Sequence, residues 1–437
     1  MLEPVLFVLF VGGAIGLGLL HSRQRVRAWE KAAVSCGLQI ASSGMPVEAW
    51  KERIMVRIEP AGDKGQATRV TAFVPGPPDL IALRLRPESM FVQGGEIEVG
   101  DVSFDSSFFV EGPPPQALAL LDAETRRLLF RLSTESRVEM SSGSLRADMA
   151  DKKVSDLLPL LIETAERFAL PMDVPQRLAE NARKDPAARA RLHNLHLLIR
   201  EFPGEPGTRE ALLVASTDPS PEVRLRAAKE LRAEGRGVLL ELAESLVDDV
   251  VSAEAVVTLE RELPFESLKS ILTRAARGRR LRTARACLEA LGRRGTEAVG
   301  VLVEVMEQEE GELAAVAAWA LGAIGSPAAE PSLIQALRRD LADLRVFAAK
   351  TLGRVGSAAA VLPLKEAAER SGLDLELRRA TRQAIAEIQS RLHGASPGQL
   401  SLAGVEAGQL SIATDPAGQV SLSGGEEERG PEPRRPV

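Results

Sequence analysis

Asp101 and Asp105, two aspartates four residues apart, form the first candidate site in this 437-residue chain. They stand in the string Gly100-Asp-Val-Ser-Phe-Asp105, and paired carboxylates can share acid–base work or bind a cation. The surrounding region has no histidine and no third ligand at a suitable spacing. Because aspartates beside glycine commonly bind backbone N–H groups in turns, we expect Asp101 and Asp105 to cap turns, with no catalytic or metal-binding role.

Two histidines, His193 and His196, form the second candidate site, three residues apart on a predicted helix. This spacing can bring two imidazoles to one metal ion. No further histidine or cysteine is close in sequence, and the chain has only two cysteines, Cys36 and Cys287. We therefore predict no metal site and no cofactor. Two cysteines so far apart in sequence also predict no disulfide framework, and a chain without disulfides fits a reducing compartment.

A cluster of arginines in the second half of the chain is the third candidate site, and within it only Glu289 opposes the positive charge. Its members are Arg274, Arg277, Arg279, Arg280, Arg282, Arg285, Arg293 and Arg294. One interpretation is a solvated surface whose charges form mutual salt bridges. The other is a docking site for an acidic protein partner or for anionic lipid, because arginine is enriched at interfaces. We take the eight arginines as the candidate binding site.

The segments that carry these arginines belong to an internal repeat. Leu313–Gly325 and Leu344–Gly356 share an Ala-Ala-x-x-Leu-Gly pattern that ends in glycine, and the anchor residues recur at intervals of 28 to 33 positions: Leu231, Leu259, Leu291, Leu321, Leu352 and Ile385. A period in this range predicts an α-solenoid, in which each unit buries its apolar face only against its neighbours. We expect the leucines to fill the core between repeats and the glycines Gly295, Gly325 and Gly356 to form left-handed helix caps.

This pattern resembles the HEAT repeat, in the short form of about thirty residues found in phycobilisome lyases. The resemblance covers about half of the chain, residues 175–393, and implies a surface for protein–protein docking. Some short HEAT proteins attach bilins, but only Cys287 and Trp319 could point to a chromophore here, so a bilin-lyase role is not expected. The string from Gly100 to Asp105, with Leu120–Arg126 after it, resembles an uncharacterised domain of membrane-anchored bacterial proteins, which implies no known activity.

The N-terminal segment predicts a membrane anchor. Pro4–Leu20 has no charged residue, and Arg23, Arg25 and Arg27 follow it. Under the positive-inside rule these arginines would hold the rest of the chain on the cytoplasmic side of the inner membrane, as a single-pass protein. A cleavable signal peptide fits less well, because the chain starts with Glu3 in place of a basic residue and no cleavage site follows the apolar run.

Between the anchor and the solenoid the periodicity is that of an α+β domain. Alternating apolar residues predict strands at 54–58, 68–74, 80–85 and 107–110 and a hairpin over 137–147, and helical spacing follows from 116 to 132 and from 154 to 169. After His393 the composition changes to Gly, Ser, Ala, Pro and Glu. Three copies of the motif Gly-Gln-Leu/Val-Ser-Leu/Ile stand ten residues apart, and they are either strand-forming motifs or a low-complexity expansion.

The sequence thus predicts a multidomain chain with an N-terminal transmembrane helix (1–22), an α+β domain (23–174), an all-α HEAT-type solenoid (175–393) and a disordered tail (394–437). We interpret it as a non-enzymatic, membrane-tethered interaction scaffold with a protein partner. The alternative is a ligand-sensing or enzymatic α+β domain whose target the solenoid recruits. A net charge of −6 argues against nucleic acid as a partner, and the oligomeric state is left open.

Overall fold

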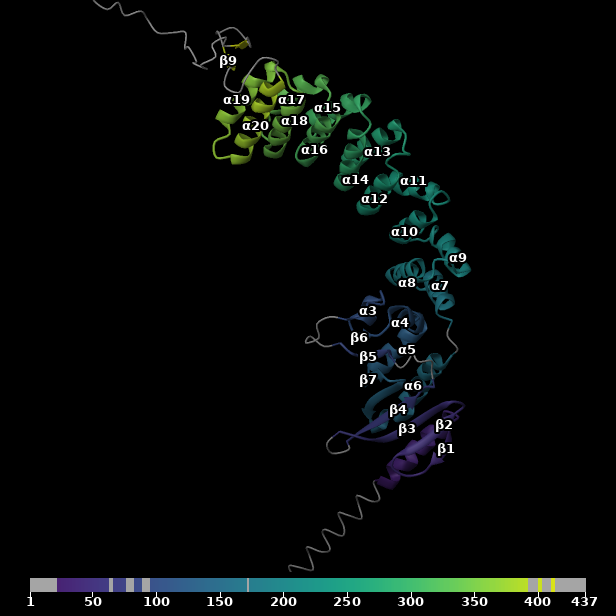
Figure 1. Cartoon of the computed structure of the whole chain (residues 1–437). Helices are drawn as coiled ribbons and strands as arrows, with labels where there is room; N and C mark the ends of the chain where they lie inside the picture. Colours follow the sequence, from purple (N-terminus) through teal and green to yellow (C-terminus); the bar gives the residue numbers. More distant parts are fainter. Residues whose placement is uncertain are drawn as a thin grey trace, which may run out of the picture. The chain divides into compact units, whose positions relative to one another are not determined.

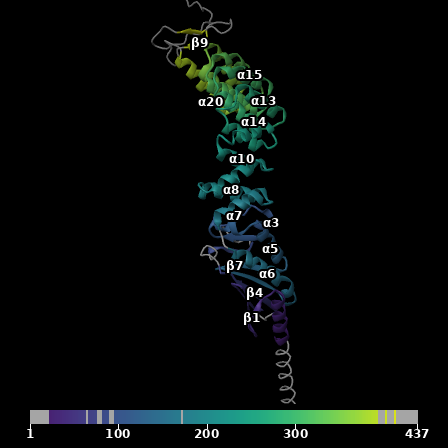
Figure 2. The ribbon, with the colours of Figure 1, turned by 90° about the vertical axis from the view of Figure 1, so that its right-hand side faces the viewer.

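The computed structural model describes residues 22–62, 66–75, 82–88, 95–170 and 173–391, and the backbone of two short strands, β9 (Leu400–Leu402) and β10 (Leu410–Ile412). The chain divides into two compact units, of which the first ends at Val238 and the second begins at Leu239 (Figures 1 and 2). The first unit contains an α+β layer followed by helices. The second unit is helical as far as Arg391.

One antiparallel sheet of eight strands forms the α+β layer, with the strand order β1-β2-β3-β4-β8-β7-β5-β6. In β3 every second residue from Ile54 to Ile58 is buried, as expected for a strand with one face on a core. The strands are β1 (Gln39–Ser42), β2 (Val47–Lys51), β3 (Ile54–Ala61), β4 (Ala67–Phe73), β5 (Arg84–Pro87), β6 (Phe108–Glu111), β7 (Ser136–Ser141) and β8 (Ser144–Ala150). The strands predicted at 54–58, 68–74 and 107–110 and the 137–147 hairpin are confirmed, whereas β1 was not predicted. The strand predicted at 80–85 is observed only from Arg84 on, as β5, and residues 80 and 81 lie outside the described part.

Helices bury one face of this sheet. The helix over residues 22–35, α5 (Ala123–Ser133) and α6 (Val154–Ala169) contribute to a single core with the inward side chains of the strands, and α6 packs directly on β3, β4 and β8. Representative members of this core are Trp29, Val56, Leu129, Leu161 and Phe168, each at most 2 % exposed. Burying a side chain of this size contributes about 1.5–3 kcal/mol.

A second core joins the α+β layer to the first helices that follow it. Leu118 and Ala119 of α4 (Pro114–Leu120) pack in one apolar cluster with residues of the next helices, including Leu178, Leu195 and Ala211. These helices are α7 (Val174–Lys184), α8 (Ala188–Glu201), α9 (Pro206–Ala215) and α10 (Pro221–Leu231). The boundary predicted at 174/175 therefore lies between elements that share a core, and the predicted domain limits stay a prediction.

Paired helices make up the second unit, and the boundary with the first unit falls within the first of them, α11. They are α11 (Arg236–Ser245), α12 (Asp249–Thr258), α13 (Phe265–Arg277), α14 (Leu281–Gly292), α15 (Val299–Gln308), α16 (Glu312–Ile324), α17 (Glu330–Ala336), α18 (Ala342–Val355), α19 (Val361–Arg370) and α20 (Leu375–Arg391). The second helices of successive pairs, from α12 to α20, pack on one another. Leu259, Leu291, Leu321 and Leu352 are buried, which confirms these four as anchors of the core between repeats, whereas the predicted anchors Leu231 and Ile385 are only half-buried.

The glycines that follow Leu291, Leu321 and Leu352 allow two helices to approach closely. A Cβ atom added at Gly322 would stand 2.7 Å from Oγ1 of Thr351, and one added at Gly353 would stand 3.0 Å from Cα of Ala384. The prediction of left-handed caps is right for Gly325, with φ of 71° and ψ of 22°. It is wrong for Gly295, whose ψ of −154° lies outside the left-handed helical region, and for Gly356, whose φ of −69° is open to any residue. Gly356 is instead needed for space, because an added Cβ would meet the carbonyl oxygen of Leu352 at 2.5 Å.

The predicted transmembrane helix is contradicted. Within the described part of the chain, no helix is long and apolar enough to cross a membrane. Its helices are short and carry charged residues; α20, for example, has 17 residues and includes Arg378, Arg379 and Arg382. Pro4–Leu20, on which the expectation rested, lies outside the described residues. The transmembrane part of the predicted fold class and the single-pass inner-membrane localisation are therefore both withdrawn.

Candidate functional site

The aspartates of the Gly100–Asp105 string bind backbone N–H groups, as predicted. The two carboxylate oxygens of Asp105 accept hydrogen bonds from the N–H groups of Val99 and Gly100, both at 2.9 Å. Asp101 caps the short helix α3 (Val102–Asp105) by accepting a bond from the N–H of Phe104. No group of three or more His, Cys, Asp or Glu side chains among the described residues could hold a metal ion.

Asp101 also takes part in a buried ion network that the sequence did not reveal. Arg126 of α5 donates from Nε to Asp101 at 3.1 Å, and from its two terminal nitrogens to both oxygens of Asp185 at 2.9 and 3.0 Å. The side chains of Arg126 and Asp185 are 2 % and 1 % exposed. Burial lowers the pKa of Arg126, but the bonds to Asp185 and Asp101 outweigh it, so that the pKa is raised and the arginine stays charged.

The same junction explains the glycine and the first histidine of the sequence motifs. Gly100 has a φ of +93°, and a Cβ atom there would lie 2.5 Å from the backbone nitrogen of Ala190 in α8. Nδ1 of His193, also on α8, lies 3.0 Å from the carbonyl oxygen of Glu98. Burial, and next the charge of Arg226, lower the pKa of His196. These histidines therefore belong to a packed junction.

The eight arginines of the predicted binding site divide into two groups. Three of them bind neighbouring parts of the chain: Arg285 pairs with Glu289 and Glu312, Arg293 pairs with Glu260, and Arg294 donates to backbone carbonyls. The other five are Arg274, Arg277, Arg279, Arg280 and Arg282, and their side chains form no hydrogen bond or ion pair with any residue that the structure describes. Of these five, Arg280 is half-buried and the others are exposed.

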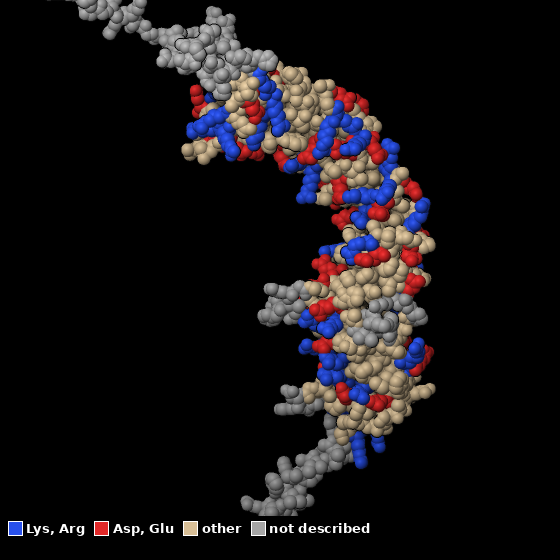
Figure 3. Space-filling view, viewed as in Figure 1, with Lys and Arg blue, Asp and Glu red and all other residues tan. Residues whose placement is uncertain are grey.

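The exposed arginines come from the end of α13, the turn after it and the start of α14. Arg274 lines a cavity of about 510 Å³ together with Glu244 and Glu266. Arg277 ends α13, Arg279 stands in the turn with a φ of +54°, and Arg282 is in the first turn of α14. The basic side chains lie among acidic ones over the surface of both units (Figure 3). Within the described residues, these arginines share the lack of a side-chain partner with other exposed arginines such as Arg261 and Arg354, and what sets them apart is that several of them stand close together in one turn and its flanking helix ends.

Arg294 belongs to a set of arginines that link successive repeats. Its Nη2 atom donates to the carbonyl oxygens of Glu260 and Leu263, each at 2.6 Å. Arg339 donates in the same way to Met306 and Glu309, and Arg391 donates to Gly353 and Gly356. Each guanidinium satisfies carbonyls near the end of a helix one repeat earlier, where the helix dipole favours a positive charge. Arg294 and Arg391 stand at or just after the end of the second helix of a pair, whereas Arg339 follows the first helix of its pair, so no regular spacing in the sequence identifies these arginines.

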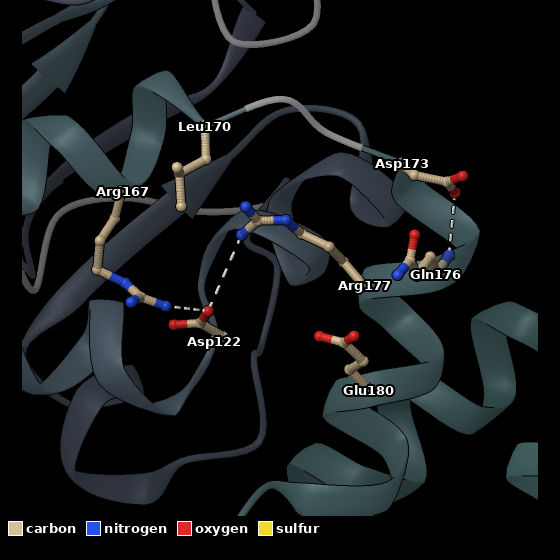
Figure 4. A pocket seen from close by; sticks show the side chains of 7 residues that line it. All are labelled: Asp122, Arg167, Leu170, Asp173, Gln176, Arg177 and Glu180. Carbon is tan, nitrogen blue, oxygen red and sulfur yellow. Dashed lines mark hydrogen bonds and ion pairs between the residues drawn. The ribbon is translucent and has the colours of Figure 1, made fainter.

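A cavity of about 620 Å³ lies in the first unit where α5, α6 and α7 come together (Figure 4). Its lining side chains are Asp122, Arg167, Leu170, Asp173, Gln176, Arg177 and Glu180. Asp122 caps α5 and accepts a hydrogen bond from Arg167, whereas Arg177 comes from the opposite wall. The cavity was not predicted, because its residues come from three elements that only the fold brings together.

Comparison with known proteins identifies the repeats. The HEAT_2 family, described as HEAT repeats, matches residues 299–386. Among solved structures, human deoxyhypusine hydroxylase in complex with glycerol is 18 % identical over 50 % of this chain and 96 % of that chain, with a TM-score of 0.21, which is too low to support an argument. No curated protein matches the chain. The predicted HEAT repeats are therefore confirmed, but nothing supports the finer assignment to the phycobilisome-lyase type.

Proposed function

We propose that the chain is a non-enzymatic interaction scaffold whose HEAT repeats dock an acidic protein partner. The HEAT match over residues 299–386 supports this role, because repeats of this kind present extended surfaces for binding. The observation that carries the proposal is the group Arg277, Arg279 and Arg282, hereafter the open arginines. They are exposed and have no ion-pair partner among the described residues, although glutamates are frequent in the neighbouring helices.

Three like charges close together repel one another, and an acidic partner would relieve that repulsion. Arginine suits this task because its planar guanidinium can hold a carboxylate with two hydrogen bonds. The helix that carries Arg282 has its other side in the core: Cys287 of α14 is fully buried, and burial raises the pKa of its thiol to about 12, so it is an inert core residue. The open arginines are thus presented at one end of a packed helix pair, α13 and α14.

The test compares the full-length chain with a variant in which Arg277, Arg279 and Arg282 are replaced by glutamine. Partners captured with the unaltered chain are identified, and the association rate with the captured partner is measured at several salt concentrations. Because electrostatic steering acts mainly on association, we expect the rate to fall by about tenfold or more at low salt and the difference to shrink at high salt.

A charge-matched control separates this surface from net charge. Arg137, Arg200 and Arg209 are exposed but paired with Glu139, Glu201 and Glu234, and their replacement by glutamine removes the same three charges. The association rate of this control variant should stay within about twofold of the rate of the unaltered chain. Equal losses in both variants, or binding that does not respond to salt, would show that the open arginines do not make the interface.

A further inference from the structure

We propose that the cavity between α5, α6 and α7 binds a free α-amino acid. This site does not depend on the docking role proposed for the second unit. Its volume of about 620 Å³ is within the usual range for small-molecule sites, which is about 300–1,000 Å³. The walls come from the N-terminal end of α5, the C-terminal end of α6 and the first turns of α7, so the cavity is formed by packed helices of a single unit.

Most charged groups that line the cavity already have partners. One oxygen of Asp122 accepts hydrogen bonds from the N–H and the hydroxyl of Thr125, both at 2.8 Å, and the other accepts from Arg167. Arg167 also donates from Nε to the hydroxyl of Thr125 at 2.8 Å. Asp173 accepts from the N–H of Gln176 at 3.1 Å. These groups form the frame of the site and have little capacity left for a ligand.

Two groups of the lining form no hydrogen bond within the described part of the chain, one of each sign. The nearest carboxylate oxygen to the guanidinium of Arg177 is on Asp122 at 3.9 Å, which is too long for a hydrogen bond. Glu180 makes no hydrogen bond or ion pair within the part of the chain that the structure describes. Both side chains are half-buried, so each charge has lost part of its hydration; Arg177 has only the long ion pair with Asp122 in return, and Glu180 has no partner among the described residues.

The positions of Arg177 and Glu180 set the chemistry of the ligand. Residues three apart on a helix are neighbours, with Cβ atoms about 5–6 Å apart. The two side chains nonetheless do not pair: Arg177 extends toward Asp122, and Glu180 lies on the next turn of the helix (Figure 4). An α-amino acid carries a carboxylate and an ammonium group on one carbon, and it could therefore bind Arg177 with the first and Glu180 with the second. Leu170 is available to the ligand's side chain.

The experiment is calorimetric titration of the full-length chain with L-leucine, L-glutamate and L-lysine, which share the α-amino acid group but differ in their side chains. At least one should bind, and N-acetyl-leucine and leucine amide, which each lack one charge, should each bind at least about tenfold more weakly than leucine if leucine is the ligand. Dileucine tests spacing: because its charges are further apart, tighter binding of dileucine than of any single amino acid would overturn the assignment.

Variants locate the site. Arg177→Gln and Glu180→Gln should each weaken binding by about tenfold or more. The matched control is Arg183→Gln, on the same helix but paired with Glu210 and outside the cavity lining, and it should bind like the unaltered chain. Circular dichroism confirms that each variant is folded. No binding of any of the three amino acids, or equal loss in the control, would refute the proposal.

Discussion

Arg126 in the first unit and Arg279 in the second are both close to a helix end, yet their surroundings are opposite. The guanidinium of Arg126 is 2 % exposed and is held by two aspartates and the carbonyl of Leu121. Arg279 is exposed in a turn, with no side-chain partner among the residues described. The first arginine therefore joins parts of the fold, whereas the second is available to another molecule.

The difference teaches how to interpret arginine in this chain. A buried charge must be paired, because taking it out of water is unfavourable by several kcal/mol unless hydrogen bonds replace the lost hydration. An exposed charge meets no such requirement, and its ion pairs contribute little. The density of arginines along the sequence therefore does not show whether an arginine joins parts of the fold or is available to another molecule. The acceptors that the fold places around each guanidinium decide between them.

The largest expected effect is at Arg126. Replacing it with methionine leaves Asp185 buried without a cation, so the free energy of unfolding should fall by about 3–5 kcal/mol, measured by urea denaturation. The control is Arg127→Met, one residue on, where the side chain is 51 % exposed and pairs with Glu124; this variant should lose less than about 1 kcal/mol. Similar losses in the two variants would remove the distinction between the two kinds of arginine.

A second replacement sharpens this test. If the loss comes from an unpaired Asp185, then adding Asp185→Leu to Arg126→Met should restore part of the stability, because apolar residues can replace a buried ion pair. A double variant less stable than either single variant would instead mean that the shape of the pair, and not its charge, holds α5 against the connection between α7 and α8.

An intermediate effect is expected at the arginines that link repeats. Arg294→Gln removes a charged donor from the carbonyls of Glu260 and Leu263, so the stability of the second unit should fall by about 1–3 kcal/mol. Arg293→Gln is the matched control, because Arg293 is 56 % exposed and pairs only with Glu260. Thermal unfolding followed by circular dichroism compares the two. An equal shift of the unfolding temperature in the two variants would show that Arg294 contributes no more to stability than the exposed, ion-paired Arg293.

The smallest expected effect concerns the exposed face of the sheet. Arg69 holds Asp148 through two hydrogen bonds, of 2.8 and 2.9 Å, and these bonds keep the pKa of Asp148 below its ordinary value although partial burial raises it. A carboxylate with a lowered pKa in the fold adds stability above its unfolded pKa of about 4, and that stability is lost as the pH falls through the folded value. In Arg69→Gln this acid-dependent loss should shrink by about 0.2–1 kcal/mol, measured by urea denaturation between neutral and acid pH. An unchanged pH profile would contradict it.

The sequence predicted those parts of the fold whose side chains repeat. The leucines at 291, 321 and 352 recur because every repeat needs the same apolar residue between its helices, and the alternation of β3 records which face of a strand is buried. Asp101 and Asp105 were interpreted correctly as capping residues, because a cap acts over a few residues of the same chain. The apolar run Pro4–Leu20 predicted a membrane span, which the described helices do not support.

Contacts between residues far apart in the chain were decided only by the tertiary structure. Asp185 is 59 positions from Arg126, and no spacing rule connects them until α4 packs on α7 and α8. The cavity at Arg177 likewise depends on three helices that have no common sequence pattern. The same holds for the division of the arginine cluster: a sequence shows where charges are dense, but the pairing of each charge depends on the acceptors that folding brings within hydrogen-bonding distance.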